Sequence, residues 1–274
     1  MKIGIIGQGF VGIAVYQKFK NFFNVLTYDI DKNKCNSEFD HVVDESKFIF
    51  VCLPTPMNSN GSCDFQIVEN TLKQLNDKKR NLIIIIKSTI PPGTTEYFNK
   101  LFNNLEIVFN PEFLTERNAV EDYNNQDRII IGGPRPASTL VKQLFSRVFK
   151  NSHIIKTGST HAEFVKYFTN CFLATKVSFS NEMFELSENF DLDYDKVIEY
   201  VKLDKRLGNS HFNVPGPDGD YGFGGHCFPK DLNAIVHLTN LKSTTNNVLK
   251  AVLKTNDKVR KNRDWEDMKG RAVN

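Results

Sequence analysis

Residues 4–12 read GIIGQGFVG, and this stretch decides the fold of the N-terminal half of the chain. Gly7, Gly9 and Gly12 form a G-x-G-x-x-G pattern that follows an apolar run and opens a helical pattern. Between a strand and a helix, the first glycine permits a tight turn, the second lets a pyrophosphate approach the backbone, and the third lets the helix pack on the strand. The stretch predicts a dinucleotide-binding βαβ unit, in which Phe10 and Val11 begin the helix that faces the phosphates.

An acidic residue stands where such a unit needs one. Asp29 ends the second apolar run, 17 residues after Gly12. A carboxylate at this place accepts hydrogen bonds from the ribose diol and repels a 2′-phosphate, so NAD is favoured over NADP as the cofactor. Lys34 is close enough in sequence to reach the same ribose or phosphate. The alternative is that Asp29 and Lys34 belong to a solvated turn.

Short β-type runs alternate with helical patterns over the first 156 residues. The runs are apolar without strict alternation, which is typical of strands covered on both faces. They predict an α/β fold with a Rossmann-like, doubly wound parallel sheet, and residues 1–156 are the expected NAD-binding domain. The expected strands are residues 2–6, 25–29, 48–53, 82–87, 106–109, 128–132 and 153–156.

Residues 157–274 predict an all-α domain with a long central helix. From about 160 to 189 there is no proline or glycine, apolar residues recur at helical spacing, and Thr160 and Glu163 form a capping-box pair. Thirty helical residues span about 45 Å, which is longer than one compact domain needs. We therefore expect this helix to form the core of a homodimer.

The rest of the helical domain surrounds an irregular loop. Shorter helices are expected at about 194–203, 229–240 and 244–262, with a glycine-containing loop at 208–225. A loop of this length inside a compact domain usually has a function. The polar tail 262–274 is expected to fray.

Composition and charge exclude several classes of function. A net charge of +3 over 274 residues is too small to indicate nucleic acid as a partner. There is no apolar run of about 18 residues, so we expect no membrane span, and the N-terminus lacks the apolar region and cleavage site of a signal peptide. Five irregularly spaced cysteines without a C-x-x-C pair indicate neither a disulfide framework nor a metal site, and they favour a reducing cytoplasm.

Residues 222–231, GFGGHCFPKD, place a cysteine two residues after a pair of glycines and before two charges. Gly224 and Gly225 are expected to give a substrate carbon room to approach Cys227, and Lys230 and Asp231 follow it by three and four residues. If a helix begins directly after the cysteine, the helix dipole favours the thiolate. A catalytic nucleophile is the favoured interpretation, and an inert buried thiol is the alternative.

A cysteine beside a nicotinamide indicates a particular reaction. An alcohol carbon loses a hydride to become an aldehyde, and the thiolate traps the aldehyde as a thiohemiacetal. Loss of a second hydride gives a thioester, which water hydrolyses to a carboxylate. The pattern thus favours a four-electron oxidation of a primary alcohol that uses two NAD.

Seven motifs, in order along residues 1–258, resemble the UDP-glucose/GDP-mannose dehydrogenase family, which contains the UDP-glucose 6-dehydrogenases. They are GQGFVG (7–12), VCLPTP (51–56), KSTIPPGTT (87–95), NPEFLTERNAVED (110–122), AEFVKYFTNCFLATKVSFSNE (162–182), DKRLG (204–208) and GFGGHCFPKD (222–231). The resemblance implies oxidation of C6 of a nucleotide sugar, with NAD as cofactor and UDP-glucose as the favoured substrate. GDP-mannose and UDP-N-acetylmannosamine stay open as substrates, because related enzymes share these motifs.

The resemblance also implies catalytic roles at matching positions. Cys227 resembles the covalent nucleophile. Lys166 and Asn170, four residues apart on the long helix, resemble the pair that holds the reacting hydroxyl and stabilises the oxyanion. Asp231 resembles the carboxylate that, with Lys166 and a water, handles the hydroxyl proton. Glu112 resembles the base that activates water against the thioester.

Cofactor and substrate contacts are implied in the same way. Thr89 resembles the residue that positions a catalytic water, and Thr55, Thr89 and Glu116 resemble cofactor contacts. Arg206 resembles an arginine that reaches the substrate phosphates bound to a neighbouring subunit. The further substrate contacts that the resemblance implies are Phe113, Leu114, Phe212, Phe223, Gly224 and Lys230.

The chain departs from the family pattern in two places. Members usually continue past the helix that ends near residue 258 into a third domain that binds the nucleotide, and we expect this chain to lack it. The segment between Asp29 and Val51 is also shorter than in the family. Two other functions stay open: a two-electron β-hydroxyacid-type dehydrogenase, which has no use for Cys227, and an inactive binding or assembly subunit.

Overall fold

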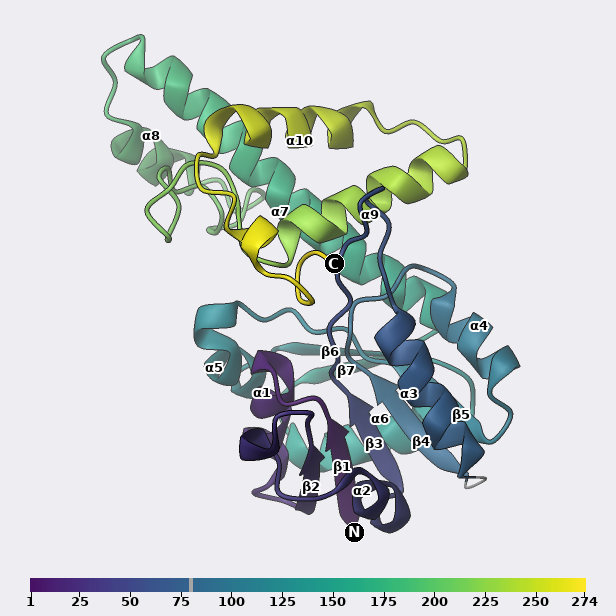
Figure 1. The fold of residues 1–274 in the computed structure, drawn as a ribbon. Coiled ribbons are helices and arrows are strands. Elements are labelled where there is room, and N and C mark those ends of the chain that lie inside the picture. Colours follow the sequence, from purple (N-terminus) through teal and green to yellow (C-terminus); the bar gives the residue numbers. More distant parts are fainter. Residues whose placement is uncertain (79–80) are drawn as a thin grey trace. The chain divides into compact units, whose positions relative to one another are not determined.

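The computed structural model describes residues 1–78 and 81–274, which form two compact units (Figure 1). The first unit contains residues 1–55 and 65–166, and the second contains residues 56–64 and 167–274. Helix α7 (Ser159–Glu188) begins in the first unit and continues into the second. The division therefore falls inside the long helix rather than before it, and the short segment 56–64 belongs to the second unit.

A seven-stranded sheet forms the centre of the first unit, in the order β2-β1-β3-β4-β5-β6-β7. All seven strands expected from the sequence are confirmed, with ends that differ by at most two residues. The first five strands pair in parallel, so their carboxyl ends lie along one edge. The strands are β1 (Lys2–Ile6), β2 (Asn24–Tyr28), β3 (Phe48–Val51), β4 (Leu82–Ile86), β5 (Leu105–Phe109), β6 (Arg128–Gly132) and β7 (His153–Thr157).

One pairing corrects the expected all-parallel sheet. β5 and β6 run antiparallel and meet through Phe109 and Gly132, whereas β6 and β7 are parallel. The only α-helix in the fully described connection between β5 and β6 is α5 (Ala119–Asn124), whose six residues rise about 9 Å. A five-residue strand is about 16 Å long, so this helix is too short to return the chain along the sheet for parallel pairing.

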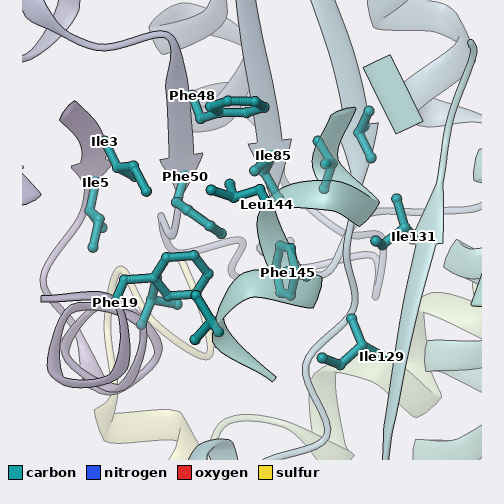
Figure 2. Packing of buried hydrophobic residues seen from close by; sticks show 14 of the residues in the cluster. Ile3, Ile5, Phe19, Phe48, Phe50, Ile85, Ile129, Ile131, Leu144 and Phe145 are labelled. Carbon is teal, nitrogen blue, oxygen red and sulfur yellow. The ribbon is translucent and has the colours of Figure 1, made fainter. Parts of the chain in front are cut away.

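Helices cover both faces of the sheet, as a doubly wound fold requires. Helices α1, α5 and α6 pack on one face with a cluster of aromatic and aliphatic side chains (Figure 2), and α2, α3 and α4 pack on the other. Alternate strand residues serve the two faces, since Ile85 lies in the first cluster and Ile84 in the second. The bounds are α1 (Phe10–Phe19), α2 (Phe39–Glu45), α3 (Gln66–Asp77), α4 (Thr94–Leu101) and α6 (Ala137–Val148), with 3-10 turns η1 (Lys32–Lys34) and η2 (Glu116–Asn118).

The helices expected for the second unit are all confirmed. α7 is followed by α8 (Tyr194–Val201), α9 (Phe228–Leu241), α10 (Asn247–Val259) and a 3-10 turn, η3 (Asp264–Asp267). Residues 202–227, all of which are described, contain no helix or strand, in agreement with the expected loop. Across the described residues, no helix combines the length and the apolar content that crossing a membrane requires.

The C-terminal tail is ordered, which corrects the expectation that it frays. The Met57 N–H donates to the Ala272 carbonyl oxygen at 2.8 Å, and the Asn274 N–H donates to the Met57 carbonyl oxygen at 3.1 Å. Trp265 and Ala272 are buried. The tail looked polar because its few apolar residues are spread out, and its partner segment lies some 200 residues earlier in the chain.

The expected capping box at the start of α7 is also corrected. The Thr160 hydroxyl donates to Oε1 of Glu96 at 2.7 Å, whereas in a capping box it would accept from an N–H group of its own helix. The buried Glu163 carboxylate accepts from the Gly93 N–H at 2.6 Å and the Thr95 N–H at 2.8 Å. Glu163 therefore caps the N-terminus of α4, a neighbour in the first unit, where a carboxylate satisfies exposed N–H groups and opposes the helix dipole.

The aromatic cluster on the first face predicts a large loss of stability on truncation. The ring of Phe145 lies 5.5 Å from that of Phe19, centroid to centroid, and is fully buried. Phe145→Ala should lower the free energy of unfolding by about 3–5 kcal/mol, because it leaves a cavity in a packed core. Urea unfolding measures this, with the half-exposed Phe22→Ala, expected to cost no more than about 1 kcal/mol, as control. Equal losses in the two variants would contradict the assigned packing.

Candidate active site

The glycine-rich turn between β1 and α1 has the geometry that the sequence predicts. Gly7 has φ +93°, and a Cβ there would lie 2.4 Å from the Cys52 carbonyl oxygen. A Cβ on Gly12 would lie 1.9 Å from the Gly7 carbonyl oxygen, so only glycine allows this helix to pack so closely. Around Gly9, by contrast, no atom lies within 4 Å of the Cβ position, which leaves room for a pyrophosphate to approach.

The start of α1 faces this turn with its backbone. Gly9 is the N-cap and has no side chain that could cap the first turn, and Phe10 and Val11 are the first residues of the helix. N–H groups at a helix N-terminus bind anions through hydrogen bonds and through the helix dipole. The turn and the helix therefore fit the pyrophosphate of NAD.

Asp29 lies beside the turn, directly after β2. Its Oδ2 accepts a hydrogen bond from the Gln8 N–H at 2.6 Å, and its Oδ1 accepts one from the Asp31 N–H at 2.9 Å. A carboxylate has about four acceptor sites, so Asp29 can still accept from a ribose hydroxyl. The exposed Lys34 pairs with Asp31, with 3.4 Å between Nζ and Oδ2. Asp29 thus also holds the glycine-rich turn, a role that its sequence position did not indicate.

A pocket of about 610 Å³ adjoins α1 within the first unit. Phe10 and Glu116, both expected cofactor contacts, line it together. Its volume is in the range of pockets that hold small ligands. Thr55 and Thr89 form a separate buried contact, in which the Thr55 hydroxyl donates to the Thr89 carbonyl oxygen at 2.8 Å. The structure thus brings Phe10 together with Glu116, and Thr55 together with Thr89.

Glu112 and Lys166 form a buried ion pair in the first unit. Nζ of Lys166 lies 2.8 Å from Oε1 of Glu112, and 3% of the lysine and 5% of the glutamate side chain are exposed. Oε2 of Glu112 accepts from the Leu114 N–H at 2.7 Å. Burial by itself raises the pKa of Glu112, but the charge and hydrogen bond of Lys166, the Leu114 N–H and the charge of Lys87 together lower it. Glu112 is therefore held as a carboxylate, the form that can take a proton from water.

A second buried lysine supports the turn that carries Glu112. Nζ of Lys87 donates to the side-chain oxygen of Asn110 at 2.8 Å and to its carbonyl oxygen at 3.2 Å. Burial lowers the pKa of Lys87 to about 8, while nearby Cys52 and Glu112 oppose the shift. Lys87 was not singled out from the sequence, although it opens the KSTIPPGTT motif directly after β4. It fixes the residue two positions before Glu112.

In the second unit, Cys227 is the N-cap of α9, and Pro229 lies in the first turn, as the sequence predicts. The 14 residues of α9 are enough for a helix dipole that favours negative charge at its start. The Cys227 side chain is partly buried. All five cysteines lie in the described part of the chain and are present as thiols.

Three buried polar side chains gather between α7 and the first turn of α9. The Asn170 amide donates to Oδ2 of Asp231 at 2.6 Å, and Nζ of Lys230 lies 2.5 Å from Oδ1 of Asp231. Burial by itself lowers the pKa of Lys230, but the negative charge of Asp231, followed by those of Cys63 and Cys227, raises it overall. Lys230 is therefore a fixed positive charge in the neighbourhood of Cys227.

Open space was expected at both glycines before Cys227, and the structure has it at only one of them. No atom lies within 4 Å of the Cβ position at Gly225, which agrees with an open approach. At Gly224, however, that position lies 2.3 Å from Nη2 of Arg260 and 2.3 Å from Oδ1 of Asp264. Gly224 therefore admits these two side chains, and it does not clear space for a substrate on that side. Neither Arg260 nor Asp264 was expected near the cysteine, because no motif contains them.

Several expected substrate contacts have other roles in the structure. Phe212 and Phe223 are buried in apolar clusters of the second unit. The Phe113 ring packs against cationic side chains of the first unit. Arg206 is exposed and pairs with Asp204, with 2.5 Å between Nη2 and Oδ2. Contact between any of these residues and a substrate stays a prediction.

Alanine at Gly9 should separate cofactor binding from folding. The Cβ position is open, so Gly9→Ala should leave the Tm within about 3 °C of wild type. The added methyl group stands where the pyrophosphate approaches, and NAD binding should weaken about tenfold or more. Fluorescence titration with NAD and thermal unfolding measure the two effects.

Gly12→Ala is the matched control, because its methyl group would collide with the Gly7 carbonyl oxygen and should lower the Tm strongly. Unchanged NAD affinity in a folded Gly9→Ala protein would show that the pyrophosphate does not bind at this turn.

Comparison with known proteins finds two family models along the chain. The NAD binding domain of the UDP-glucose/GDP-mannose dehydrogenase family matches residues 34–153, and the central domain of the same family matches residues 160–258. Both matches agree with the family resemblance that the motifs indicate.

Individual relatives cover nearly the whole chain. A UDP-glucose 6-dehydrogenase of Campylobacter jejuni is 33% identical over 94% of this chain and 72% of its own length. One of Bacillus subtilis is 29% identical over 94% of this chain and 63% of its own length. The solved structure of a UDP-glucose dehydrogenase from Pyrobaculum islandicum has a TM-score of 0.85 and 28% identity, over 94% of this chain and 68% of that one. The chain therefore spans 63–72% of the length of these three relatives.

The glycine-rich turn, the doubly wound sheet, the long helix and these matches agree with one another. The chain belongs to the UDP-glucose/GDP-mannose dehydrogenase family, and its first unit carries the NAD-binding domain of that family.

Proposed function

We propose that this protein oxidises C6 of a nucleotide sugar from a primary alcohol to a carboxylate, through a covalent intermediate on Cys227. The observation that carries the proposal is the place of Cys227 at the N-cap of α9, with the Lys230–Asp231 pair in the first turn. A thiol at a helix N-terminus near a fixed positive charge suits a nucleophile, and a two-electron dehydrogenase has no use for one. Bound NAD accepts hydride, and two molecules in succession take the four electrons.

The sugar carbon changes its oxidation state twice. The hydroxyl gives up its proton and C6 gives up a hydride, which leaves an aldehyde. The Cys227 thiolate adds to the aldehyde carbon, and the oxyanion of the resulting thiohemiacetal gives up a second hydride to become a thioester. Water attacks the thioester carbon, one of its protons passes to Glu112, and the carboxylate and the thiol are released. The carbon loses four electrons, and the water supplies the second carboxylate oxygen.

The roles that we propose for the polar groups agree with the partners of Asp231 and Glu112. Asp231, which accepts from the Asn170 amide, takes the hydroxyl proton with Lys166 and a water. Lys166 and Asn170, one turn apart on α7, donate hydrogen bonds to the developing oxyanion. Glu112, kept as a carboxylate by Lys166, activates the hydrolytic water, which Thr89 positions.

UDP-glucose is the substrate that we favour, with UDP-glucuronate as the product. Support comes from the relatives at 33% and 29% identity, which are named UDP-glucose 6-dehydrogenases. GDP-mannose, which also stands in the name of the family, and UDP-N-acetylmannosamine are the alternatives. Values of kcat/KM for the three sugar nucleotides distinguish them.

We propose a homodimer built on α7. Phe172 and Phe179 are 56% and 60% exposed, and further apolar side chains continue at helical spacing on the same face. An exposed apolar stripe of this kind on a helix is typical of a buried interface. A second copy of the chain presents the same stripe, so the interface is self-complementary. The stripe consists of Phe168, Phe172, Phe179, Met183 and Leu186 of α7, and the exposed Phe190 follows just after the helix. Arg206 would then extend toward the substrate of the neighbouring subunit.

Blocking thioester hydrolysis should trap the covalent intermediate. Glu112→Gln removes the general base, which typically contributes about 10² to 10⁴-fold, so the acyl form of Cys227 should accumulate with NAD and UDP-glucose. Mass spectrometry should find the added mass of the glucuronyl nucleotide on the peptide that contains Cys227. The wild-type protein should form two NADH for each UDP-glucuronate.

The control is the double variant Glu112→Gln, Cys227→Ser, which should carry no thioester. Since glutamine cannot neutralise the buried Lys166, thermal unfolding of both variants is measured alongside. One NADH per sugar nucleotide, together with normal turnover after Cys227→Ala, would refute the covalent mechanism and favour a two-electron dehydrogenase.

A charge in the apolar stripe should break the dimer. Phe172→Asp places an unpaired carboxylate in the proposed interface, and the protein should become a monomer at about 10–50 µM, as measured by analytical ultracentrifugation. Leu241→Asp changes an apolar side chain at the end of α9 that is 68% exposed, against 56% for Phe172; it is the control and should leave the dimer intact. A wild-type protein that sediments as a monomer in this range would rule out the dimer and the role of Arg206 with it.

A further inference from the structure

Side chains from distant elements hold the glycine-rich loop before Cys227. Asn181 of α7 accepts a hydrogen bond from the Gly222 N–H at 3.1 Å. Asn256 of α10 accepts from the Phe223 N–H at 2.7 Å and donates to the Phe223 carbonyl oxygen at 3.0 Å. These bonds satisfy buried backbone groups that have no strand or helix partner.

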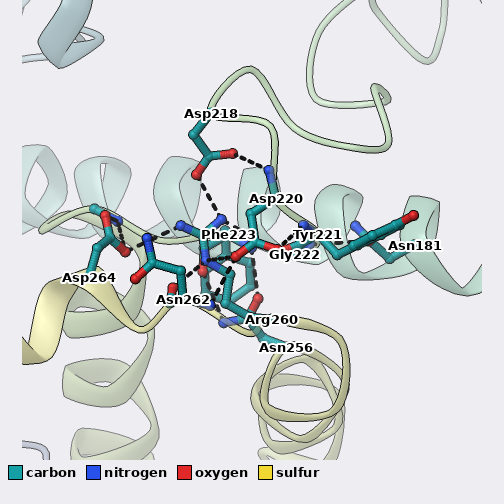
Figure 3. A network of polar contacts seen from close by, with 11 residues as sticks. Asn181, Asp218, Asp220, Tyr221, Gly222, Phe223, Asn256, Arg260, Asn262 and Asp264 are labelled. Atoms are coloured by element: carbon teal, nitrogen blue, oxygen red, sulfur yellow. Dashed lines mark hydrogen bonds and ion pairs between the residues drawn. The ribbon is translucent and has the colours of Figure 1, made fainter.

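Arg260, the C-cap of α10, extends this network (Figure 3). Only 1% of its side chain is exposed. Its guanidinium nitrogens lie 2.7 Å from Asp218, 3.3 Å from Asp264 and 3.5 Å from Asp220. It also donates to the Tyr221 carbonyl oxygen at 3.4 Å. One buried positive charge is thus surrounded by three carboxylates, the pairing that a buried charge requires.

Asp264 links this arginine to the backbone next to the cysteine. Both of its carboxylate oxygens accept from the Gly225 N–H at 3.1 Å. The approach is possible only because residue 224 is a glycine, since a Cβ there would lie 2.3 Å from Arg260 and from Asp264. Gly225 precedes Cys227 by two residues, so a residue of the C-terminal tail fixes the chain that leads into the N-cap of α9.

We propose that Arg260 and Asp264 are positioning residues that set the reactivity of the Cys227 thiol. They hold the backbone of Gly224 and Gly225, and through it they keep the sulfur at the N-terminus of α9. There the helix dipole and the charge of Lys230 stabilise a thiolate. The consequence for turnover rests on the proposed function, whereas the reactivity of the thiol can be measured without cofactor or substrate.

Asp264→Asn tests the proposal with a side chain of the same shape. Both carboxylate oxygens of Asp264 accept from the Gly225 N–H, so the NH₂ group of the new amide replaces one of these acceptors in either orientation. Two hydrogen-bond donors then face each other. The rate of alkylation of Cys227 by iodoacetamide at pH 7 should fall about tenfold, and the curve of rate against pH should move to higher pH. Peptide mass spectrometry gives the rate for Cys227, with Cys35 of the first unit as the internal reference.

Two matched controls separate this effect from a general loss of negative charge. Asp267→Asn changes an exposed carboxylate in the same 3-10 turn. Asp218→Asn removes another carboxylate that pairs with Arg260, 2.7 Å away. Since the proposal depends on the bond from Asp264 to Gly225, both variants should keep the alkylation rate of Cys227 within about twofold of wild type.

Arg260→Lys is a second, milder variant, in case Asp264→Asn lowers the Tm strongly. Lysine keeps a positive charge but loses the guanidinium Nη2 that donates to Oδ1 of Asp264 and the Nη1 that donates to the Tyr221 carbonyl oxygen. The alkylation rate should fall by about threefold. A rate within twofold of wild type in whichever of the two variants remains folded would overturn the proposal.

The outcomes for this proposal and for the proposed function are distinguishable. Slower alkylation in the variants together with one NADH per sugar nucleotide in the wild type would support the positioning role and refute the covalent oxidation. Two NADH per sugar nucleotide together with unchanged alkylation would support the covalent oxidation and refute the positioning role. If both proposals hold, kcat should fall in step with the alkylation rate, while KM for NAD stays close to that of the wild type.

Discussion

The pairing of buried charges is the constraint on which both halves of this protein depend. Glu112 and Lys166 are buried together in the first unit, and the Arg260 guanidinium is buried among carboxylates in the second. Removing one member of such a pair leaves the other uncompensated, which typically costs about 3–5 kcal/mol. Each charge is therefore held in one place before any ligand binds, and this is the preorganisation that electrostatic catalysis needs.

The sheet determines where the polar residues of the first unit can lie. Its central strands are apolar on both faces, so polar side chains are excluded from the strands and follow them instead. Asp29 comes directly after β2, Thr89 follows β4, and Glu112 follows β5. In a doubly wound fold, the carboxyl ends of parallel strands form the edge at which ligands bind. The apolar composition of the strands thus explains both the burial of the sheet on two faces and the position of the candidate-site residues after the strands.

In the second unit, the loop before Cys227 has no regular backbone pairing, so its backbone polar groups need other hydrogen-bond partners. Glycine lets the loop take its path, and side chains from α7, α10 and the tail supply the missing hydrogen-bond partners. Glu163 does the same in the first unit by capping α4. In both units, residues from one element complete the hydrogen bonding of another, so the polar groups stabilise tertiary structure as well as their own segments.

Local patterns in the sequence were enough to predict the glycine-rich turn, the seven strands, the long helix α7 with the three shorter helices α8, α9 and α10, and the N-cap position of Cys227. The spacing of apolar residues and the residue types that form turns and helix caps involve positions only a few residues apart, so a single segment is enough to predict these local structures. Only the tertiary structure decided that β6 runs antiparallel to β5, that Gly224 makes room for Arg260, and that the polar tail folds back. The pairs involved lie far apart in the chain, such as Gly225 with Asp264 and Met57 with Ala272. Whether a charged side chain is solvated or buried beside a partner depends on which distant segments pack together, and no local pattern specifies that.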